Sequence, residues 1–364
     1  MTDPETDVDT AAFRSYLSRE LEATVADAEG LHDGLNLSVA ISTEDGGRAY
    51  VLRRPNKLRR TESFNDLREE YEVLRRLRDT AVDAPEPVLI CDDESVLGDP
   101  FLVMTHLDGE SVPLGSPLPE RFRTPAARER VASLLIETLA DLHSVDTEPF
   151  AAVCEQETAR EQVERVTARL DAATAVTGRD PPRLRSVADW LERNAPSDSE
   201  MALVHGDYRP SNVLFADADR PVIAGVLDWE TAFLGDPLTE LGYLLLRWRD
   251  DGDPTPPLDE LRARYSNDDV LRDLEETNER GLAPFTNRPG SPSRRELVAR
   301  YEEATGVAFE NDRFYRALAA FMLATVWEDL HRHQIEAGLE SDWEPYVDYM
   351  AMIADSIASG EFPL

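Results

Sequence analysis

The sequence has 364 residues, of which 41% are hydrophobic and 30% charged, with a formal net charge of −35. This length and composition predict a globular protein with a sizeable core and exclude a disulfide-stapled mini-domain. The longest apolar stretch, near Leu241–Leu246, is far short of the roughly 20 residues that a membrane span needs. The acidic start MTDPETDVDT has neither the basic nor the apolar region of a secretory signal. We therefore expect a cytoplasmic protein without a membrane partner, whose two cysteines, Cys91 and Cys154, are reduced.

The charged residues are unusual in kind as well as in number. There are 73 acidic residues against 38 basic ones, and Lys57 is the only lysine. Repulsion among so many carboxylates weakens a fold in dilute buffer, whereas molar salt screens it and carboxylates keep the surface hydrated. We expect a halophilic protein, with an acidic protein of an ordinary cell as the alternative. The same charge disfavours a nucleic-acid partner, and nothing in the pattern indicates an oligomeric state.

In the first third of the chain, short strands alternate with a helix. After a helix-like N-terminal stretch, Leu37–Ile41 and Arg48–Arg53 alternate in polarity across a Glu-Asp-Gly-Gly turn, which predicts a β-hairpin. In Phe64–Arg78, apolar residues recur every three or four positions, which predicts a helix. Strands are then expected at Pro87–Cys91 and Phe101–Thr105.

From about residue 106 the pattern becomes mainly helical. Thr124 and Pro125 fit the N-cap and first position of a helix, and later helices are expected at Ser291–Tyr301 and Phe314–Gln334. The sequence therefore predicts a small sheet-rich lobe, residues 1–105, followed by a larger helical lobe, residues 106–364. This is an α+β fold.

A second hairpin is expected inside the helical lobe. Val213–Phe215 and Val222–Leu227 are apolar and are separated by a polar turn. Antiparallel pairing places Asn212, just before the first strand, beside Asp228, just after the second. Their side-chain oxygens can therefore converge on one hard cation such as Mg²⁺.

The segment Leu203–Asn212 reads LVHGDYRPSN, and Val226–Glu230 reads VLDWE. Together they resemble the catalytic and metal loops of kinases. Transfer of a γ-phosphoryl group needs a carboxylate to accept the hydroxyl proton, and further oxygens to hold magnesium. Asp207, Asn212 and Asp228 supply that set.

The order H-G-D-x-x-x-x-N and then L-D-W-E is similar to the aminoglycoside phosphotransferase family, which has the two-lobed protein-kinase-like fold. Longer strings resemble the kinase-like domain associated with acyl-CoA dehydrogenases: VLRRP at 51–55, EEYEVLRRL at 69–77, VLGDPFLVM at 96–104 and LDWETAFLGDPLTELGYLL at 227–245. The resemblance covers residues from about 34 to about 340.

For the nucleotide lobe, the resemblance implies a set of contacts to ATP. Backbone groups of the GLNLS segment would cover the phosphates, and the hinge Met104–Leu107 would meet the adenine. The usual phosphate-binding lysine is replaced by Arg53, with Arg54 and Lys57 as competitors. The implied nucleotide-site residues are Gly34, Asn36, Ser38, Arg53, its partner Glu70, Met104 and His106.

For the helical lobe, the resemblance implies that Asp207 orients the acceptor hydroxyl and that Asn212 and Asp228 hold Mg²⁺. Arg209 would reach the γ-phosphate, or is a plain surface arginine. Two further residues are expected to be supports: His205 holds the loop by hydrogen bonds, and Asp236 caps a helix and braces the loop.

The expected function is phosphoryl transfer from ATP, with GTP as an open alternative, to a hydroxyl of a small molecule. The resemblance favours a metabolic hydroxyl, such as that of a hydroxyacyl compound, over an antibiotic. A second hypothesis is a nucleotide-binding pseudokinase that acts as a regulatory module, because the phosphate segment has one glycine and Arg53 replaces lysine. The presence of Asp207 argues against this alternative, since a scaffold without activity does not need it.

Overall fold

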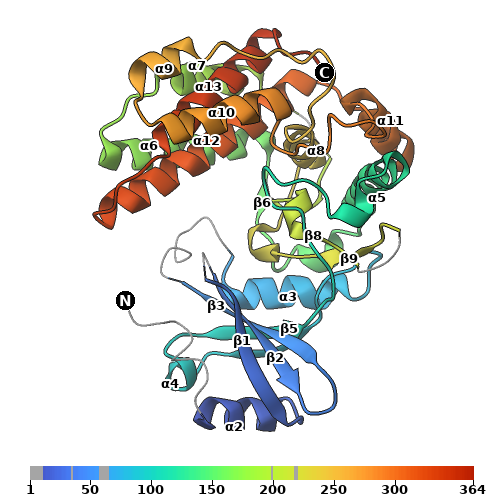
Figure 1. The fold of residues 1–364 in the computed structure, drawn as a ribbon. Coiled ribbons are helices and arrows are strands. Elements are labelled where there is room, and N and C mark those ends of the chain that lie inside the picture. Colours follow the sequence, from blue (N-terminus) through green and yellow to red (C-terminus); the bar gives the residue numbers. More distant parts are fainter. Residues whose placement is uncertain (1–10, 34–35, 57–64, 198–199, 217–219) are drawn as a thin grey trace.

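The protein is described by a computed structural model covering residues 11–33, 36–56, 65–197, 200–216 and 220–364. Figure 1 shows two lobes, one built on a twisted sheet and the other mainly of helices. The predicted α+β, two-lobed architecture is confirmed. Gly34 and Lys57 lie outside the described residues.

The N-terminal lobe is a five-stranded sheet with strand order β1-β2-β3-β5-β4. The predicted hairpin is present, because β2 and β3 pair antiparallel with Ile41 opposite Tyr50. The first strand was not expected from its largely polar sequence, VADAEGLHD. The elements of the N-terminal lobe are α2 (Ala11–Glu20), β1 (Val25–Asp33), β2 (Asn36–Thr43), β3 (Arg48–Pro55), α3 (Leu67–Leu77), β4 (Pro87–Cys91), α4 (Glu94–Leu97) and β5 (Phe101–Thr105).

Helix α3 lies between the sheet and the helical lobe (Figure 1). It begins with a capping box, in which the Asp66 side chain accepts from backbone N–H groups and Glu69 reaches back to the Asp66 N–H. Its apolar side chains are buried, and so is Glu70. A buried carboxylate needs a partner, and that partner is part of the site described below.

The C-terminal lobe contains most of the helices. Thr124 caps α5 and Pro125 is its first residue, as predicted. The helices are α5 (Pro125–His143), α6 (Ala159–Thr177), α7 (Pro182–Asn194), α8 (Pro237–Leu245), α9 (Asp259–Arg264), α10 (Asp268–Arg280), α11 (Arg294–Thr305), α12 (Asp312–Glu336) and α13 (Glu344–Ser359). Short strands complete it: β6 (Gln156–Glu157), β7 (Ala202–Val204), β8 (Val213–Phe215), β9 (Ile223–Val226) and β10 (Phe233–Gly235).

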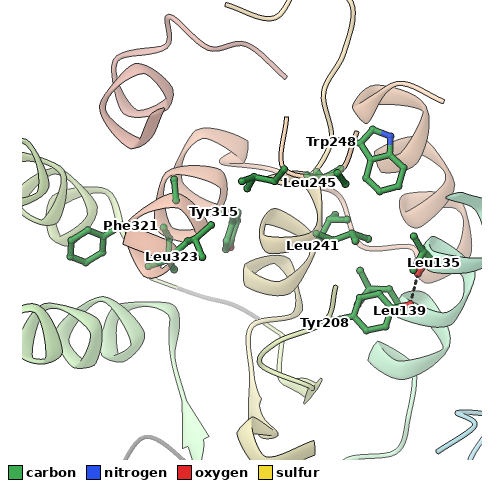
Figure 2. Packing of buried hydrophobic residues seen from close by; sticks show 14 of the residues in the cluster. Leu135, Leu139, Tyr208, Leu241, Leu245, Trp248, Tyr315, Phe321 and Leu323 are labelled. Carbon is green, nitrogen blue, oxygen red and sulfur yellow. Dashed lines mark hydrogen bonds between the residues drawn. The ribbon is translucent and has the colours of Figure 1, made fainter. Parts of the chain in front are cut away.

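The main core fixes the segment that carries the site. Tyr208 is fully buried between α5 and α8, near Leu139 and Leu241, and its hydroxyl donates to the Leu135 carbonyl at 2.8 Å (Figure 2). The same core cluster includes Leu102 and Met104 of β5, so it continues into the N-terminal lobe. The loop around Tyr208 is therefore anchored on packed helices, and the core that holds it extends into the N-terminal lobe.

Two smaller expectations concern cysteines and membranes. Cys91 and Cys154 are free and buried, as expected. Within the described ranges, no helix has the length and apolar character that crossing a membrane requires.

Candidate active site

The candidate site lies on a loop, His205–Asn212, that we call the catalytic loop. Strand β7 leads into it, and a short 3-10 turn at Pro210–Asn212 ends it. Gly206 has φ +84°, and a Cβ there would lie 2.3 Å from the Thr231 carbonyl oxygen. Glycine is needed because this conformation and this close approach both exclude a side chain.

The Asp207 carboxylate is held by three neighbouring side chains. Arg209 Nε donates to both oxygens at 2.9 Å. Asn212 Nδ2 donates to Oδ2 at 2.9 Å, and Tyr243 OH donates to Oδ1 at 2.8 Å. The structure thus joins Asp207, Arg209 and Asn212, three of the residues that the sequence singled out, and adds Tyr243.

Two of these neighbours have shifted pKa values. Burial opposes the positive charge of Arg209, but the Asp207 carboxylate outweighs it and raises the pKa of the guanidinium. Burial raises the pKa of the Tyr243 hydroxyl, and the nearby Asp207 charge acts in the same direction. Tyr243 therefore stays protonated at neutral pH and is a hydrogen-bond donor to Asp207. The string at 227–245 includes Tyr243 but does not mark its role, so the position of α8 reveals this contact.

His205 supports the loop through both ring nitrogens. Nε2 lies 2.7 Å from the Leu227 carbonyl oxygen, and Nδ1 accepts the Asp207 backbone N–H at 3.2 Å. A carbonyl can only accept and a backbone N–H can only donate, so these contacts assign the neutral imidazole with its proton on Nε2. His205 is fully buried, and this geometry supports the structural role expected for it.

Two carboxylates on α8 support the loop in different ways. Asp236 caps the helix by accepting from the Leu238 N–H, as predicted, and it also accepts from the Tyr315 hydroxyl at 2.7 Å. The contacts that we observe to the catalytic loop come from Glu240, which accepts backbone N–H groups of His205 and Gly206 at 3.0 and 2.7 Å. The sequence reasoning missed Glu240, because no motif marks which turn of α8 faces the loop.

The second hairpin forms as predicted, but its register separates the two expected metal ligands. Val213 pairs with Val226, and the Leu227 N–H donates to the Asn212 carbonyl at 2.8 Å. Leu227 is therefore the residue opposite Asn212, and Asp228 follows it one position further along the chain. The backbone of Asp228 is left-handed, with φ +66°. In this structure the Asn212 amide contacts Asp207, while Asp228 faces Arg53. Asp228 is therefore not directly opposite Asn212.

The donor chemistry still fits a magnesium ion. Because Asn212 Nδ2 donates to Asp207, its amide oxygen points the other way and can accept a cation. The Asp228 side chain is 47% exposed, so its carboxylate can be reached. Among the described residues, no group of three or more His, Cys, Asp or Glu side chains could hold a metal.

Arg53 lies at the centre of a buried ion cluster. Its Nη1 donates to Glu70 at 2.7 Å, and its Nη2 contacts Glu230 and lies 3.0 Å from Asp228. Burial alone lowers the pKa of this guanidinium, but the three carboxylates outweigh it and raise the pKa far above its usual value. Its competitor Arg54 instead donates to the Leu97 carbonyl. Of the described candidates, Arg53 is the cation that faces the site.

Glu230 is a further residue that the sequence reasoning did not assign. It contacts Arg53, accepts from Asn36 Nδ2 at 3.3 Å, and its carbonyl accepts from the Asn65 N–H at 2.8 Å. Residues 36, 53 and 65 belong to the N-terminal part of the chain and Glu230 to the helical lobe. Glu230 therefore connects the two lobes. It is the last residue of the LDWE string, which is the feature of the sequence that could have indicated it.

The nucleotide segment and the hinge differ in part from expectation. Asn36 and Ser38 lie in β2, where Ser38 pairs with Arg53 on one side and His32 on the other, so these two residues have strand geometry. Met104 is buried in β5. The His106 N–H donates to the Ala49 carbonyl at 2.9 Å, so in this conformation it is not the donor to an adenine.

The two-lobed fold is that of kinase-like phosphotransferases. The model of the phosphotransferase enzyme family matches residues 28–285, and the chain belongs to this family. The family resemblance expected from the sequence is thereby confirmed.

Individual relatives agree with this result. The chain is 31% identical over 316 residues to acyl-CoA dehydrogenase family member 11 of Gallus gallus, covering 83% of this chain and 36% of that protein. It is 27% identical over 348 residues to the Homo sapiens protein of the same name, covering 90% of this chain and 40% of that protein. The chain thus spans well under half the length of these relatives.

Solved structures show the same fold at low identity. A putative aminoglycoside phosphotransferase from Ralstonia eutropha superposes with a TM-score of 0.70 at 22% identity, covering 96% of this chain and 98% of that one. A choline kinase from Streptococcus pneumoniae gives a TM-score of 0.55 at 15% identity, covering 94% and 97%.

Proposed function

We propose that the protein transfers the γ-phosphoryl group of ATP, with Mg²⁺, to a hydroxyl group of a small molecule. The observation that carries the proposal is the Asp207 carboxylate of the catalytic loop, which Arg209, Asn212 and Tyr243 hold by hydrogen bonds. A carboxylate fixed in this way can orient a hydroxyl and take its proton. We expect neither a nucleic-acid nor a membrane partner.

In the proposed reaction the acceptor oxygen attacks the γ-phosphorus and its proton passes to Asp207. The bond from this phosphorus to the oxygen of ADP breaks, and ADP leaves with that electron pair. Arg53 contributes a two-donor cation for the phosphates, and Arg209 lies beside the reacting carboxylate. Asn212 and Asp228 would hold Mg²⁺, which shields the phosphate charge when bound.

Two observations support an enzyme over a regulatory pseudokinase. Asp207 keeps a full set of donors, and the family of the chain is one of phosphotransferases. Arg53 contacts both Glu70 and Glu230, which supports a cation site that is kept although lysine is replaced. The relatives named for acyl-CoA dehydrogenases favour a metabolic acceptor.

The test is ATP and GTP consumption in molar KCl against a library of small hydroxyl compounds. Asp207→Asn should lower kcat by about 10²–10⁴-fold with nucleotide affinity little changed, because the carboxylate acts on the acceptor. Asp228→Ala should instead remove the Mg²⁺ dependence of nucleotide binding, measured by calorimetry. If the wild type binds ATP but phosphorylates nothing, and Asp207→Asn changes no rate including slow ATP hydrolysis, the regulatory alternative replaces the enzyme.

A further inference from the structure

A small cavity lies between the end of α8, the connection from α10 to α11 and the C-terminal helix α13. Its volume is about 40 Å³, and most of its lining is apolar, including Leu245 and Trp248 (Figure 2). Three arginines also line it, Arg249, Arg294 and Arg316, and none of the acidic residues in the described ranges does. The chain has 73 acidic residues against 38 basic ones, so a cavity whose charged lining is arginine alone runs against the composition and indicates an anion site.

Arg316 of α12 is a buried cation that uses only one side of its guanidinium. It is 2% exposed. Its Nη1 donates to the Phe362 carbonyl at 3.2 Å and lies 3.4 Å from Asp312, whose side chain is 32% exposed. Within the described part of the chain, no acceptor forms a hydrogen bond with its Nε or Nη2. These two nitrogens form one edge of the guanidinium, so a pair of N–H donors is left for a ligand.

The charge of Arg316 is poorly compensated by the protein. Burial lowers the pKa of its guanidinium, the positive charge of Arg294 acts in the same direction, and together they bring the pKa to about 10. Asp312 opposes this shift only in part. Arg316 is therefore still charged at neutral pH, and a charge removed from water needs a counter-charge or full hydrogen bonding.

Arg294 adds a second positive charge at the same cavity. It is 2% exposed and pairs with Asp253 through its terminal nitrogens, while its Nε is buried without a hydrogen-bond partner and lies 3.6 Å from Asp250. Both guanidinium carbons lie over the Phe362 ring, at 5.2 Å from its centre for Arg294 and 5.5 Å for Arg316. A ring face attracts a cation less strongly than a charged partner does, so the Phe362 ring does not replace an anion.

We propose that the cavity binds a chloride ion, held by Nε and Nη2 of Arg316. A cavity of about 40 Å³ has room for one ion of this kind but not for the chain of an organic acid, because a water molecule in the liquid already takes about 30 Å³. A water molecule could accept these hydrogen bonds, but it would leave the positive charge uncompensated. A dianion such as sulfate would lose more hydration between mostly apolar walls. This site is independent of the phosphotransfer function.

The experiment varies the chloride concentration at constant ionic strength. Chloride is raised from about 0.1 M to about 2 M at constant potassium, and gluconate, which is too large for the cavity, makes up the difference, so that screening stays the same. Thermal melts are recorded for the wild type, for Arg316→Met, which removes the donors and keeps an unbranched side chain, and for Arg313→Met. Arg313 is the matched control, because it lies on the same helix and donates to the Ala358 carbonyl without lining the cavity. A crystal soaked in bromide instead of chloride locates the ion by its anomalous scattering.

We expect the melting temperature of the wild type to rise by about 1–3 °C over this series, since an ion that binds only the folded state stabilises it more as its concentration increases. Arg313→Met should show the same rise, and Arg316→Met should show none. In the bromide crystal, an anomalous peak is expected beside Nε and Nη2 of Arg316.

A melting temperature of the wild type that does not depend on chloride would overturn the proposal, and so would a rise of equal size in Arg316→Met. A cavity that holds only water in the bromide crystal, or a larger anion that bromide does not displace, would overturn it as well. Should Arg316→Met not fold, the wild-type series and the bromide crystal decide between chloride and water without a variant.

Discussion

At the scale of single residues, the ion cluster shows how the Arg53 guanidinium is held in the site. The two ends of the Arg53 guanidinium serve different partners, Glu70 at one and Asp228 with Glu230 at the other. A lysine ammonium is one point charge and cannot span both sides. The Arg53 guanidinium therefore joins Glu70 of α3 to the two carboxylates that follow β9.

We predict that Arg53→Ala destabilises the protein as well as weakening ATP binding. It leaves the buried carboxylates of Glu70 and Glu230, whose side chains are 0% and 8% exposed, without their cation. Breaking a buried ion pair in this way costs about 3–5 kcal/mol, which a denaturant titration can measure. Arg54→Ala is the control, because Arg54 donates to a backbone carbonyl. Equal stability and equal ATP affinity of Arg53→Ala and the wild type would contradict this role.

At the scale of elements, α8 supplies two side chains that hold the catalytic loop. Glu240 accepts from three backbone N–H groups of the catalytic loop and lies 3.2 Å from His143 Nε2. One turn later, Tyr243 reaches Asp207. Residues three or four positions apart share one face of a helix, so this single helix sets both the loop backbone and the reacting carboxylate.

Glu240→Gln should loosen the catalytic loop. The amide replaces one accepting oxygen by a donor, which leaves buried N–H groups unpaired at about 1–3 kcal/mol. We expect lower stability by that amount in denaturant titrations, a lower kcat, and faster hydrogen exchange at Gly206 and Tyr208. Glu137→Gln, the same substitution at an exposed position of α5, should change stability by less than about 0.5 kcal/mol. A kcat and exchange rate unchanged in Glu240→Gln would remove Glu240 from this role.

The features that could be predicted from the sequence are those with local signals. Both hairpins have a turn between apolar strands, and Thr124-Pro125 and Asp236-Pro237 mark helix starts. The strand β1 could not be predicted, because its polar sequence becomes a strand by pairing with β2. We propose that the division between the lobes lies after Thr105, where β5 ends.

The site residues that could be predicted are likewise those with a local signal in the sequence. The spacing of the strings HGDYRPSN and LDWE marks Asp207, Asn212 and Asp228, whereas Glu230 lies in the second string without a role being predicted for it. Glu240 and Tyr243 lie on α8, and their roles depend on how that helix packs against the loop. The one-residue offset between Asn212 and Asp228 also depends on the strand register, which the sequence pattern leaves open.

At the scale of the whole molecule, we propose that the protein works in molar salt. The chain has few basic residues, and two of them, Arg53 and Arg294, are buried and pair with buried carboxylates. The remaining acidic excess gives the net charge of −35. Dilution lengthens the distance over which like charges repel from about 3 Å at 1 M salt to about 10 Å at 0.1 M.

We therefore expect the melting temperature to fall when KCl is diluted from roughly 2–3 M to 0.1 M, because screening is lost. Circular dichroism melts across this series measure the effect. Sucrose at matched osmotic strength is the control, since it carries no charge and should not restore the melting temperature fully. A melting temperature independent of salt would contradict the halophilic interpretation.

The three partners of Asp207 have a consequence for the resting molecule. A carboxylate has about four positions at which it accepts hydrogen bonds, and Arg209, Asn212 and Tyr243 together fill two on each oxygen. When only a nucleotide is bound, the Asp207 carboxylate would therefore have no free acceptor position with which to activate a water molecule. An incoming acceptor hydroxyl would have to displace one of these donors. In the proposed reaction, the side chains that hold Asp207 would therefore also limit the hydrolysis of ATP by water.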